Sequence, residues 1–329
     1  MSILVTGGAG YIGSHMVLAL ADAGQPVVVL DNLSTGFRWA IDSRATLIEG
    51  DTGDDALVAR LLKDHAVDAI IHFAGSIVVP ESVTDPLGYY LNNTVKSRGL
   101  IAAAVAAGVG KFIFSSTAAV YGNVAMTPVP EEADLRPVSP YGSSKLMTEI
   151  MLADTARAHP LRYVALRYFN VAGADPKGRS GQSTPRATHL IKIACETALG
   201  KRKYMEVFGT DYPTSDGTCI RDYIHVTDLA EAHMAALAHL NRDGDSCVLN
   251  CGYSKGYTVL QVIDAVKRVS GINFEVRLSA RRPGDPASIV AASDRIRSEL
   301  GWMPAHDNLD KIVTEALAWE HKLGLKVNT

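Results

Sequence analysis

Residues 2–20, SILVTGGAGYIGSHMVLAL, decide the fold. A short apolar run ends in glycines, and apolar residues at helical spacing follow, which is typical of a strand, a tight turn and a helix. Gly8, Gly10 and Gly13 fit the G-x-G-x-x-G spacing, and Gly7, Gly10 and Gly13 fit a neighbouring variant. Glycines let the backbone approach a pyrophosphate, and the N-terminus of the next helix attracts its negative charge. The stretch therefore predicts a dinucleotide site.

Short runs rich in β-branched residues alternate with helix-like segments through the first half of the chain. After the first run come PVVVLDN (26–32), ATLIEGD (45–51), DAIIHFAG (68–75), KFIFSS (111–116) and RYVALRYFN (162–170). This alternation indicates a parallel sheet with helices on both faces. CVLNCGY (247–253) is a late return to that sheet. We predict an α/β fold: a doubly wound Rossmann-type parallel sheet with a smaller mixed α/β C-terminal substrate domain.

The alternation breaks down after residue 171, because residues 172–217 are rich in glycine, proline and polar residues. We therefore expect the chain to cross between two domains more than once. Ligands of doubly wound sheets bind beyond the carboxyl ends of the strands. The predicted NAD-binding domain comprises residues 1–171 and 222–253, and the predicted substrate domain comprises residues 172–221 and 254–329.

Composition and charge exclude nucleic acid as an expected partner. The chain has 329 residues, of which 47% are hydrophobic, and a formal net charge of −3 at pH 7. No basic stretch is long enough to track a phosphate backbone. No apolar run reaches the roughly 20 residues that span a bilayer, so we expect no membrane partner.

Cysteine usage points to a reducing compartment. Cys195, Cys219, Cys247 and Cys251 form no CxxC pair, and no histidine accompanies them at metal-binding spacing. We expect four reduced, mostly buried thiols and no metal site. Structured sequence begins at Ser2, so we also expect no signal peptide. The expected localisation is cytoplasmic.

Two aspartates end predicted strands next to the glycine turn. Asp31 ends the second strand, where a carboxylate accepts both hydroxyls of an adenosine ribose and repels a 2′-phosphate, which favours NAD over NADP. The alternative for Asp31 is a loop-capping role. Asp51 ends the third strand and is a candidate for contact with the adenine. The alternative for Asp51 is an N-cap of the following helix.

SPYGSSK, residues 139–145, places Tyr141 and Lys145 one helical turn apart. Ser139 has a capping hydroxyl and Pro140 suits the first helical position. On a surface, this would be an ordinary pair. Beside a nicotinamide, the ammonium and the positive ring both favour the phenolate, so the tyrosine pKa falls from about 10 toward neutral pH. Such a phenolate takes a proton from a hydroxyl while hydride leaves the same carbon.

FSSTAAVYG, residues 114–122, follows a buried strand and supplies hydroxyls at the carboxyl edge of the sheet. We expect Thr117 to share the hydrogen bond of the substrate with Tyr141. The alternative is that Ser115, Ser116 and Thr117 satisfy backbone groups of the loop.

At this point the chain resembles a known family over nearly its full length. The matching segments, in order, are TGGAGYIGSH, DNLSTG, HFAG, the asparagines at 92–93, FSSTAAVYG, SPYGSSK, LRYFNVAGA, GTDYPTSDGTCIRDYIHVTDLA and RRPGD. The chain resembles the UDP-glucose (UDP-galactose) 4-epimerases, which are extended short-chain dehydrogenases/reductases. The glycine turn and the Tyr–Lys pair occur throughout that superfamily, whereas the segment around RDYIH is much more specific.

The resemblance implies a role for each matching position. Its catalytic residues are Thr117, Tyr141 and Lys145. Its cofactor-binding residues are Gly7, Gly10, Tyr11, Ile12, Gly13, Asp31, Asn32, Asp51, Thr52, Phe73, Ala74, Gly75, Asn92, Thr117, Tyr141, Lys145 and Phe169. Its substrate-binding residues are Thr117, Tyr141, Asn170, His189, Leu190, Phe208, Arg221, Arg282 and Asp285. The two arginines suit a diphosphate, because guanidinium forks bind it bidentately.

The resemblance also implies the reaction and the assembly. NAD is a retained cofactor, UDP-galactose and UDP-glucose interconvert through a transient 4-keto sugar, and the sugar turns over inside the site while UDP tethers it. The implied assembly is a homodimer that pairs the helices around 85–108 and 140–158. The same reaction serves galactose metabolism and surface-polysaccharide synthesis.

Three positions depart from the family pattern. Some members carry a cofactor-contacting lysine where this chain has Ile77, which predicts weaker retention of NAD. A common Asn-Asn-Leu reads Thr188-His189-Leu190, and His189 is either a hydrogen-bonding substitute or a surface histidine. Ile289 aligns with the position that tunes tolerance of an N-acetyl group, and its intermediate size leaves that tolerance open.

Competing functions differ in the residues they need. A 4,6-dehydratase needs an acid/base pair directly after the threonine, where this chain has Ala118 and Ala119. A 4-epimerase of UDP-N-acetylglucosamine, UDP-glucuronate or UDP-xylose stays an alternative. The motifs do not identify the residues that would contact the distal part of the sugar. A non-catalytic NAD-binding scaffold should lack the tyrosine or the lysine, and both are present.

Overall fold

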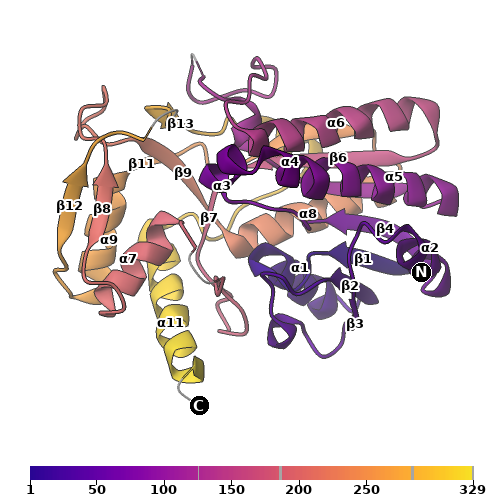
Figure 1. Ribbon diagram of the computed structural model, residues 1–329, viewed down its shortest axis with the longest axis horizontal. Coiled ribbons are helices and arrows are strands. Elements are labelled where there is room, and N and C mark those ends of the chain that lie inside the picture. Colours follow the sequence, from indigo (N-terminus) through magenta and orange to yellow (C-terminus); the bar gives the residue numbers. More distant parts are fainter. Residues whose placement is uncertain (125, 185–186, 283–284, 328–329) are drawn as a thin grey trace.

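The predicted doubly wound sheet is present. The computed structural model describes residues 1–124, 126–184, 187–282 and 285–327. Its largest sheet has seven strands, in the order β10-β6-β5-β4-β1-β2-β3, and every neighbouring pair is parallel (Figure 1). The strands are β1 (Ser2–Thr6), β2 (Val27–Asp31), β3 (Thr46–Glu49), β4 (Val67–His72), β5 (Lys111–Thr117), β6 (Arg162–Tyr168) and β10 (Cys247–Cys251). The late return of the chain to the sheet is therefore confirmed.

Helices bury both faces of this sheet, which explains why its strands are apolar throughout. Ile3 and Val5 of β1 pack in one cluster with α1 and α8, and Leu4 between them packs in the other cluster with α2, α5 and α6. The helices are α1 (Tyr11–Asp22) and α8 (Val226–Asn241) on the first face, and α2 (Asp55–Asp64), α5 (Lys96–Ala107) and α6 (Pro140–Ala158) on the second.

The helical region predicted from Asp85 to Gly108 is interrupted. It consists of α4 (Pro86–Tyr89), a π-helical segment (Tyr90–Val95) and α5, and the short helix α3 (Val79–Thr84) precedes it. Asp85 caps α4 by accepting a hydrogen bond from the Gly88 amide at 3.0 Å. π-Helical turns are rare and are often found at functional sites.

A smaller group of elements lies at one end of the large sheet (Figure 1). The chain crosses between the two groups more than once, since β9 pairs in the small sheet while the next helix, α8, covers the large one. The division into two domains at the boundaries given above stays a prediction. The small sheet contains β7 (Asn170–Ala172), β9 (Ile220–His225), β11 (Gly256–Thr258) and β13 (Ser288–Ile289), and a separate pair contains β8 (Met205–Phe208) and β12 (Val276–Ser279).

The remaining helices complete the smaller group and the connecting loops. Helices α7, α9 and α11 pack against one another. Their bounds, with those of α10 and two 3₁₀ turns, are α7 (Leu190–Ala198), α9 (Val259–Ser270), α10 (Asp294–Leu300), α11 (Leu309–Val327), Arg38–Ala40 and Ala118–Val120. In the part of the chain that the structure describes, no helix combines the length and apolarity needed to cross a bilayer.

The expectation for the cysteines is confirmed. Cys195, Cys219 and Cys251 are buried, Cys247 is half-buried, and all four are free thiols. Burial raises the pKa of the Cys195 thiol to about 12, so it stays protonated at neutral pH. These cysteines are packing residues rather than nucleophiles.

Three histidines are buried among the helices and strands next to the glycine turn. His72 lies between the hydroxyls of Thr6 and Ser97, at 2.6 and 2.8 Å. Burial lowers the pKa of His72 to about 3, and it lowers the pKa of His15 and of His233 to about 4. All three rings are therefore neutral at pH 7.

Acid should destabilise this fold through its buried histidines. The folded-state pKa of each buried histidine lies below the ordinary value of 6.5, so between pH 6.5 and about 4 the unfolded chain binds more protons than the native one. As the pH is lowered through that window, the free energy of unfolding should decrease by about 1.4 kcal/mol per pH unit for each such histidine. Urea unfolding at a series of pH values measures this slope.

A pair of variants isolates the contribution of one ring. His233→Gln should reduce the slope of the unfolding free energy against pH by the contribution of one histidine. His159→Gln, at an exposed position, should leave this slope unchanged. Equal slopes for the His233 variant and the wild type would contradict the assignment.

Candidate functional site

The glycine turn between β1 and α1 has no space for side chains. A Cβ atom on Gly13 would lie 2.1 Å from the Gly7 carbonyl oxygen, and one on Gly7, whose φ is +71°, would lie 2.6 Å from the Ala74 nitrogen. The N-cap of α1 is Gly10, and no side chain caps this helix end. The amides of the first turn, which includes Tyr11 and Ile12, are thus available to an anion at the carboxyl edge of the sheet.

Asp31 ties the end of β2 to the glycine turn. Its carboxylate accepts hydrogen bonds from the Ala9 amide at 2.9 Å and from the Leu33 amide at 2.8 Å. The loop-capping alternative is therefore real for this residue. It does not exclude a ribose contact, because two carboxylate oxygens offer about four acceptor sites.

Asp51 does not cap a helix, so the N-cap alternative for it is wrong. The N-cap of α2 is Asp54, which accepts from the Leu57 amide at 2.9 Å. Asp51 instead accepts from the Asn32 side-chain amide at 3.0 Å and from the Lys96 ammonium at 2.7 Å. The residue that caps a helix is the one whose side chain accepts a hydrogen bond from the free amides of the first turn. In α2 this residue is Asp54, three residues after Asp51. Thr52, next to Asp51, is buried.

The loop after β4 is held by the π-helical segment. Asn93 accepts from the Ser76 amide at 2.7 Å and donates to the Ser76 carbonyl at 3.0 Å, and the side chain of Asn92 donates to the Ser76 hydroxyl at 2.9 Å. Gly75 directly precedes this clamp, and a Cβ atom on it would lie 3.0 Å from Asn93 Oδ1. Ile77, at the position of the family lysine, is about half exposed at 49%.

Phe73 and Phe169 lie at the same edge of the sheet. Phe73 directly follows β4, and its amide donates to the Thr6 carbonyl at 3.0 Å. Its ring packs against His233 with centroids 4.8 Å apart. Phe169 lies between β6 and β7 and is buried. The loops that follow β1, β2, β4 and β6 are therefore neighbours at this edge.

Helix α6 begins as the sequence predicts. Ser139 accepts from the Gly142 amide at 3.2 Å, and Pro140 occupies the first helical position. Tyr141 and Lys145 follow on the buried side of the helix, with exposed fractions of 7% and 2%. The alternative of a surface pair is therefore wrong.

The side chain of Tyr141 lies close to that of Thr117 at the end of β5. The hydroxyl of Thr117 accepts from the Ala119 amide at 3.2 Å, as expected of a loop hydroxyl. Burial raises the pKa of Tyr141, and the Thr117 hydroxyl only partly opposes this. The predicted lowering of this pKa concerned the tyrosine beside the positive ring of the cofactor, so it stays a prediction. In the protein alone, desolvation dominates and raises the pKa of Tyr141.

Lys145 has few partners for a buried ammonium. It donates to the Ser115 carbonyl at 3.1 Å and lies 4.9 Å from the centre of the Phe114 ring. Burial lowers its pKa to about 8, and the carboxylate of Glu149 opposes that lowering. At neutral pH the lysine is therefore charged by a narrow margin.

The predicted substrate residues fall into two groups. Arg221 donates to the Asp285 carboxylate at 3.0 Å, and the guanidinium of Arg282 lies 3.8 Å from the centre of the Phe208 ring. Pro283 and Gly284 of the RRPGD motif lie outside the described residues.

The second group lines a small pocket that is partly open to solvent. Asn170, His189 and Leu190 lie there together with Tyr11, which connects the substrate residues to the glycine turn. His189 is half-buried and within 3.3 Å of the Gln182 side-chain amide. It is therefore not a surface histidine.

Sequence reasoning missed a buried ion pair beneath the Tyr–Lys pair. Glu149 and Arg167 are both buried, and their closest atoms are 2.7 Å apart. Glu149 lies at the same four-residue spacing after Lys145 as Lys145 does after Tyr141. An acidic residue at that spacing was a signal that the sequence contained.

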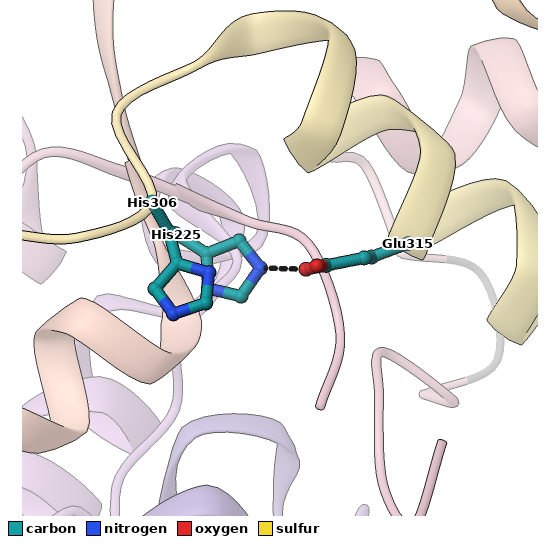
Figure 2. Close-up of side chains that lie close together, drawn as sticks. All are labelled: His225, His306 and Glu315. Carbon is teal, nitrogen blue, oxygen red and sulfur yellow. Dashed lines mark hydrogen bonds and ion pairs between the residues drawn. The ribbon is translucent and has the colours of Figure 1, made fainter. Parts of the chain in front are cut away.

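A cluster outside this site gathers possible metal ligands. Figure 2 shows His225, His306 and Glu315, whose donor atoms lie within 4.8 Å of one another. The two rings are stacked, with centroids 4.6 Å apart and planes 19° apart, so their in-plane lone pairs do not converge on one ion. Nδ1 of His225 accepts from the Thr227 amide at 3.0 Å, which leaves the proton on Nε2 for donation to Glu315 at 2.5 Å. We interpret the cluster as a link between the end of β9 and α11.

The fold and the site define a Rossmann-type, dinucleotide-dependent enzyme, and comparison with known proteins gives its family. The model of the NAD dependent epimerase/dehydratase family matches residues 3–252. A UDP-glucose 4-epimerase of Azospirillum brasilense is 58% identical over 321 residues, which cover 98% of this chain and 92% of that protein.

Solved structures match this chain over nearly its full length. The UDP-glucose 4-epimerase from Brucella ovis in complex with NAD is 43% identical, with a TM-score of 0.94 and coverage of 97% of this chain and 98% of that one. The enzyme from Bifidobacterium longum in complex with NAD+ and UDP is 37% identical, with a TM-score of 0.93 and coverage of 98% of each chain. The chain belongs to the NAD dependent epimerase/dehydratase family.

Gly13→Ala tests the glycine turn. The added methyl group would overlap the Gly7 carbonyl at 2.1 Å, so we expect a loss of about 1–3 kcal/mol of stability and a large drop in the NAD that copurifies. Thermal unfolding and the NAD content of denatured protein measure the two effects.

Gly110→Ala is the matched control, because its Cβ atom would meet only the Pro160 carbonyl oxygen at 3.7 Å. It should stay within about 0.5 kcal/mol of the wild type. Normal stability and NAD content in the Gly13 variant would contradict the packing argument.

Proposed function

We propose that this protein is a UDP-glucose 4-epimerase that interconverts UDP-galactose and UDP-glucose with NAD as a retained cofactor. The observation that carries the proposal is the burial of Tyr141, Lys145 and Thr117 together at the carboxyl edge of a dinucleotide-binding sheet, with the hydroxyl of Tyr141 close to that of Thr117. The names of the relatives, at up to 58% identity, favour this pair of sugars over other UDP-sugars.

The residues at the sheet edge fit the cofactor of the family. The uncapped start of α1 would hold the pyrophosphate, and the remaining acceptor sites of Asp31 would hold the adenosine ribose. When bound, NAD supplies the hydride acceptor and donor that a transient 4-keto sugar requires. Ile77 offers no hydrogen bond to the cofactor, so we infer weaker retention than in relatives with a lysine there.

Tyr141 and Thr117 handle the proton of the reacting hydroxyl. Thr117 holds the 4-hydroxyl of the sugar in place, and the Tyr141 phenolate removes its proton and later returns it. A charged Lys145 one helical turn away favours the phenolate over the neutral phenol. These three residues need not move, because they are anchored on β5 and α6.

The substrate residues hold the nucleotide while the sugar turns. Arg221 and Arg282 suit the diphosphate, and Asp285 orients the first of them through its 3.0 Å contact. Phe208 provides an apolar face beneath Arg282. Asn170, His189 and Leu190 line the pocket on the side of the cofactor. Epimerisation requires that both faces of the keto sugar reach one hydride source, so only the nucleotide end should be bound tightly.

Incubation of the purified protein with UDP-galactose, without added NAD, tests the proposal. We expect UDP-glucose to accumulate to equilibrium, as followed by chromatography. Conversion that requires added NAD would support the weakened retention at Ile77. No conversion under either condition would reject this substrate pair, and UDP-N-acetylglucosamine, UDP-glucuronate and UDP-xylose would then be assayed.

Tyr141→Phe is the critical variant of this assay. Removing one hydroxyl should lower turnover by about 10²–10⁴-fold, the usual share of a general base. NAD content and UDP binding should stay close to those of the wild type, since the glycine turn, Asp31 and the two arginines that would hold these ligands are unchanged. Near-normal turnover would reject Tyr141 as the base.

We also propose a cytoplasmic homodimer. Helix α4, the π-helical segment and α6 pack side by side, and all three carry exposed apolar side chains at helical spacing. Exposed apolar area of this kind favours association. The reduced thiols suit the cytoplasm. The apolar residues are Leu87, Leu91, Val95, Met147 and Ile150.

A charge placed on this face should separate the subunits. Leu87 is 78% exposed, and Leu87→Glu should shift sedimentation from dimer to monomer because a carboxylate cannot be desolvated there without a partner. Leu278 is 65% exposed on β12, outside this face, so Leu278→Glu should remain dimeric. A wild-type monomer, or identical behaviour of the two variants, would reject the proposed interface.

A further inference from the structure

Three side chains form a row along the buried face of α6. Tyr141, Lys145 and Glu149 follow one another at four-residue spacing, and all are buried. The first two belong to the proposed reaction. The third is a carboxylate that contacts neither the glycine turn nor the substrate residues in any recorded hydrogen bond of the described chain. Its burial therefore requires another explanation.

Glu149 is held rigidly from the sheet. Ser116 on β5 donates to its Oε1 at 2.5 Å, and Arg167 on β6 donates through Nε at 3.1 Å and through Nη2 at 2.7 Å. Arg167 is held in turn by the Tyr121 hydroxyl at 3.0 Å and the Glu131 carbonyl at 3.1 Å. Buried ion pairs contribute little net stability, because desolvation cancels most of their attraction. A pair this well fixed directly behind a working lysine suggests a role in the chemistry.

The charged and titratable neighbours of Lys145 are few. On α6 they are Tyr141 and Glu149, and on β4 the neighbour is His72, which is neutral because burial lowers its pKa to about 3. On β6, Arg167 is paired to Glu149, and Tyr168, whose pKa burial raises, accepts a hydrogen bond from Ser115. Among the described residues, Glu149 is thus the negative charge that favours the protonated lysine.

We propose that Glu149 is a positioning residue that keeps Lys145 in its charged form at the working pH, and thereby determines how far into alkaline pH the epimerisation continues. The inference deepens the proposed function, since only a charged lysine helps Tyr141 to act as a base. Burial already lowers the pKa of Lys145 to about 8. A small additional loss of stabilisation of the charged ammonium would therefore leave the lysine mostly neutral near pH 7. Glu149 supplies the opposing charge without contacting substrate.

The first test measures the lysine directly and does not depend on activity. The full-length protein with bound NAD is labelled with ¹³Cε-lysine, and Lys145→Met identifies the resonance by its disappearance. We expect the titration midpoint of Lys145 in Glu149→Gln to lie about one pH unit below that of the wild type. An unchanged midpoint would overturn the inference.

The second test is the pH profile of turnover. Glu149→Gln keeps the size of the side chain but loses its charge, so the alkaline limb of kcat should move to lower pH by about one unit. Glu149→Asp keeps the charge but loses a methylene, so its limb should stay near that of the wild type. If Glu149 had only a structural role, both variants would have a lower kcat, and the alkaline limb would stay at the pH of the wild type. That result would overturn the inference.

The outcomes separate this inference from the proposed function. If the wild type does not convert UDP-galactose, the proposed function fails, and the NMR titration still decides the role of Glu149. If Glu149→Gln does not fold, because Arg167 is left buried and unpaired, the double variant Glu149→Gln/Arg167→Gln removes both charges. Its Lys145 midpoint should again lie below that of the wild type, and an equal midpoint would reject the role.

Discussion

The parallel pairing of β1 between β2 and β4 is the constraint on which the rest of the structure depends. Thr6 pairs with Leu30 on one side and with His72 on the other, so the three strands end at the same level. The glycine turn, Asp31 and Phe73 follow those ends directly and become neighbours. The packing is close enough that a single Cβ atom on Gly7 would overlap the Ala74 amide. Because helices cover both faces, polar chemistry is confined to this edge.

Several polar groups are buried behind this edge, and two of them are paired with partners from other elements. His72 bridges two hydroxyls from different elements, and Arg167 holds Glu149 from across the sheet. Each contact pairs a polar group that would be costly to bury without a partner. The arrangement leaves Lys145 with a backbone carbonyl, an aromatic ring and one nearby carboxylate, so its charge depends on a small number of neighbours.

The sequence predicted those features that depend on the spacing of residues close together in the chain. Apolar runs gave the seven strands, and helical spacing placed Tyr141 and Lys145 on one face of α6. Other features depend on contacts between distant segments, which spacing does not reveal. The cap of α2 is Asp54 rather than Asp51, because Asp51 is drawn to Lys96 on α5. The pairing of Glu149 with a residue on β6 and the desolvation that raises the tyrosine pKa also require the packed fold.

The π-helical segment Tyr90–Val95 has a consequence for how this chain can vary in length. An α-helix turns by about 100° per residue, and a π-helical turn contains one residue more than an α-helical turn. Loss of that residue would rotate one side of the helix relative to the other. Either Asn92 and Asn93 would leave the loop after β4, or Leu100 would leave the core. We infer that a one-residue deletion here is less tolerable than most substitutions.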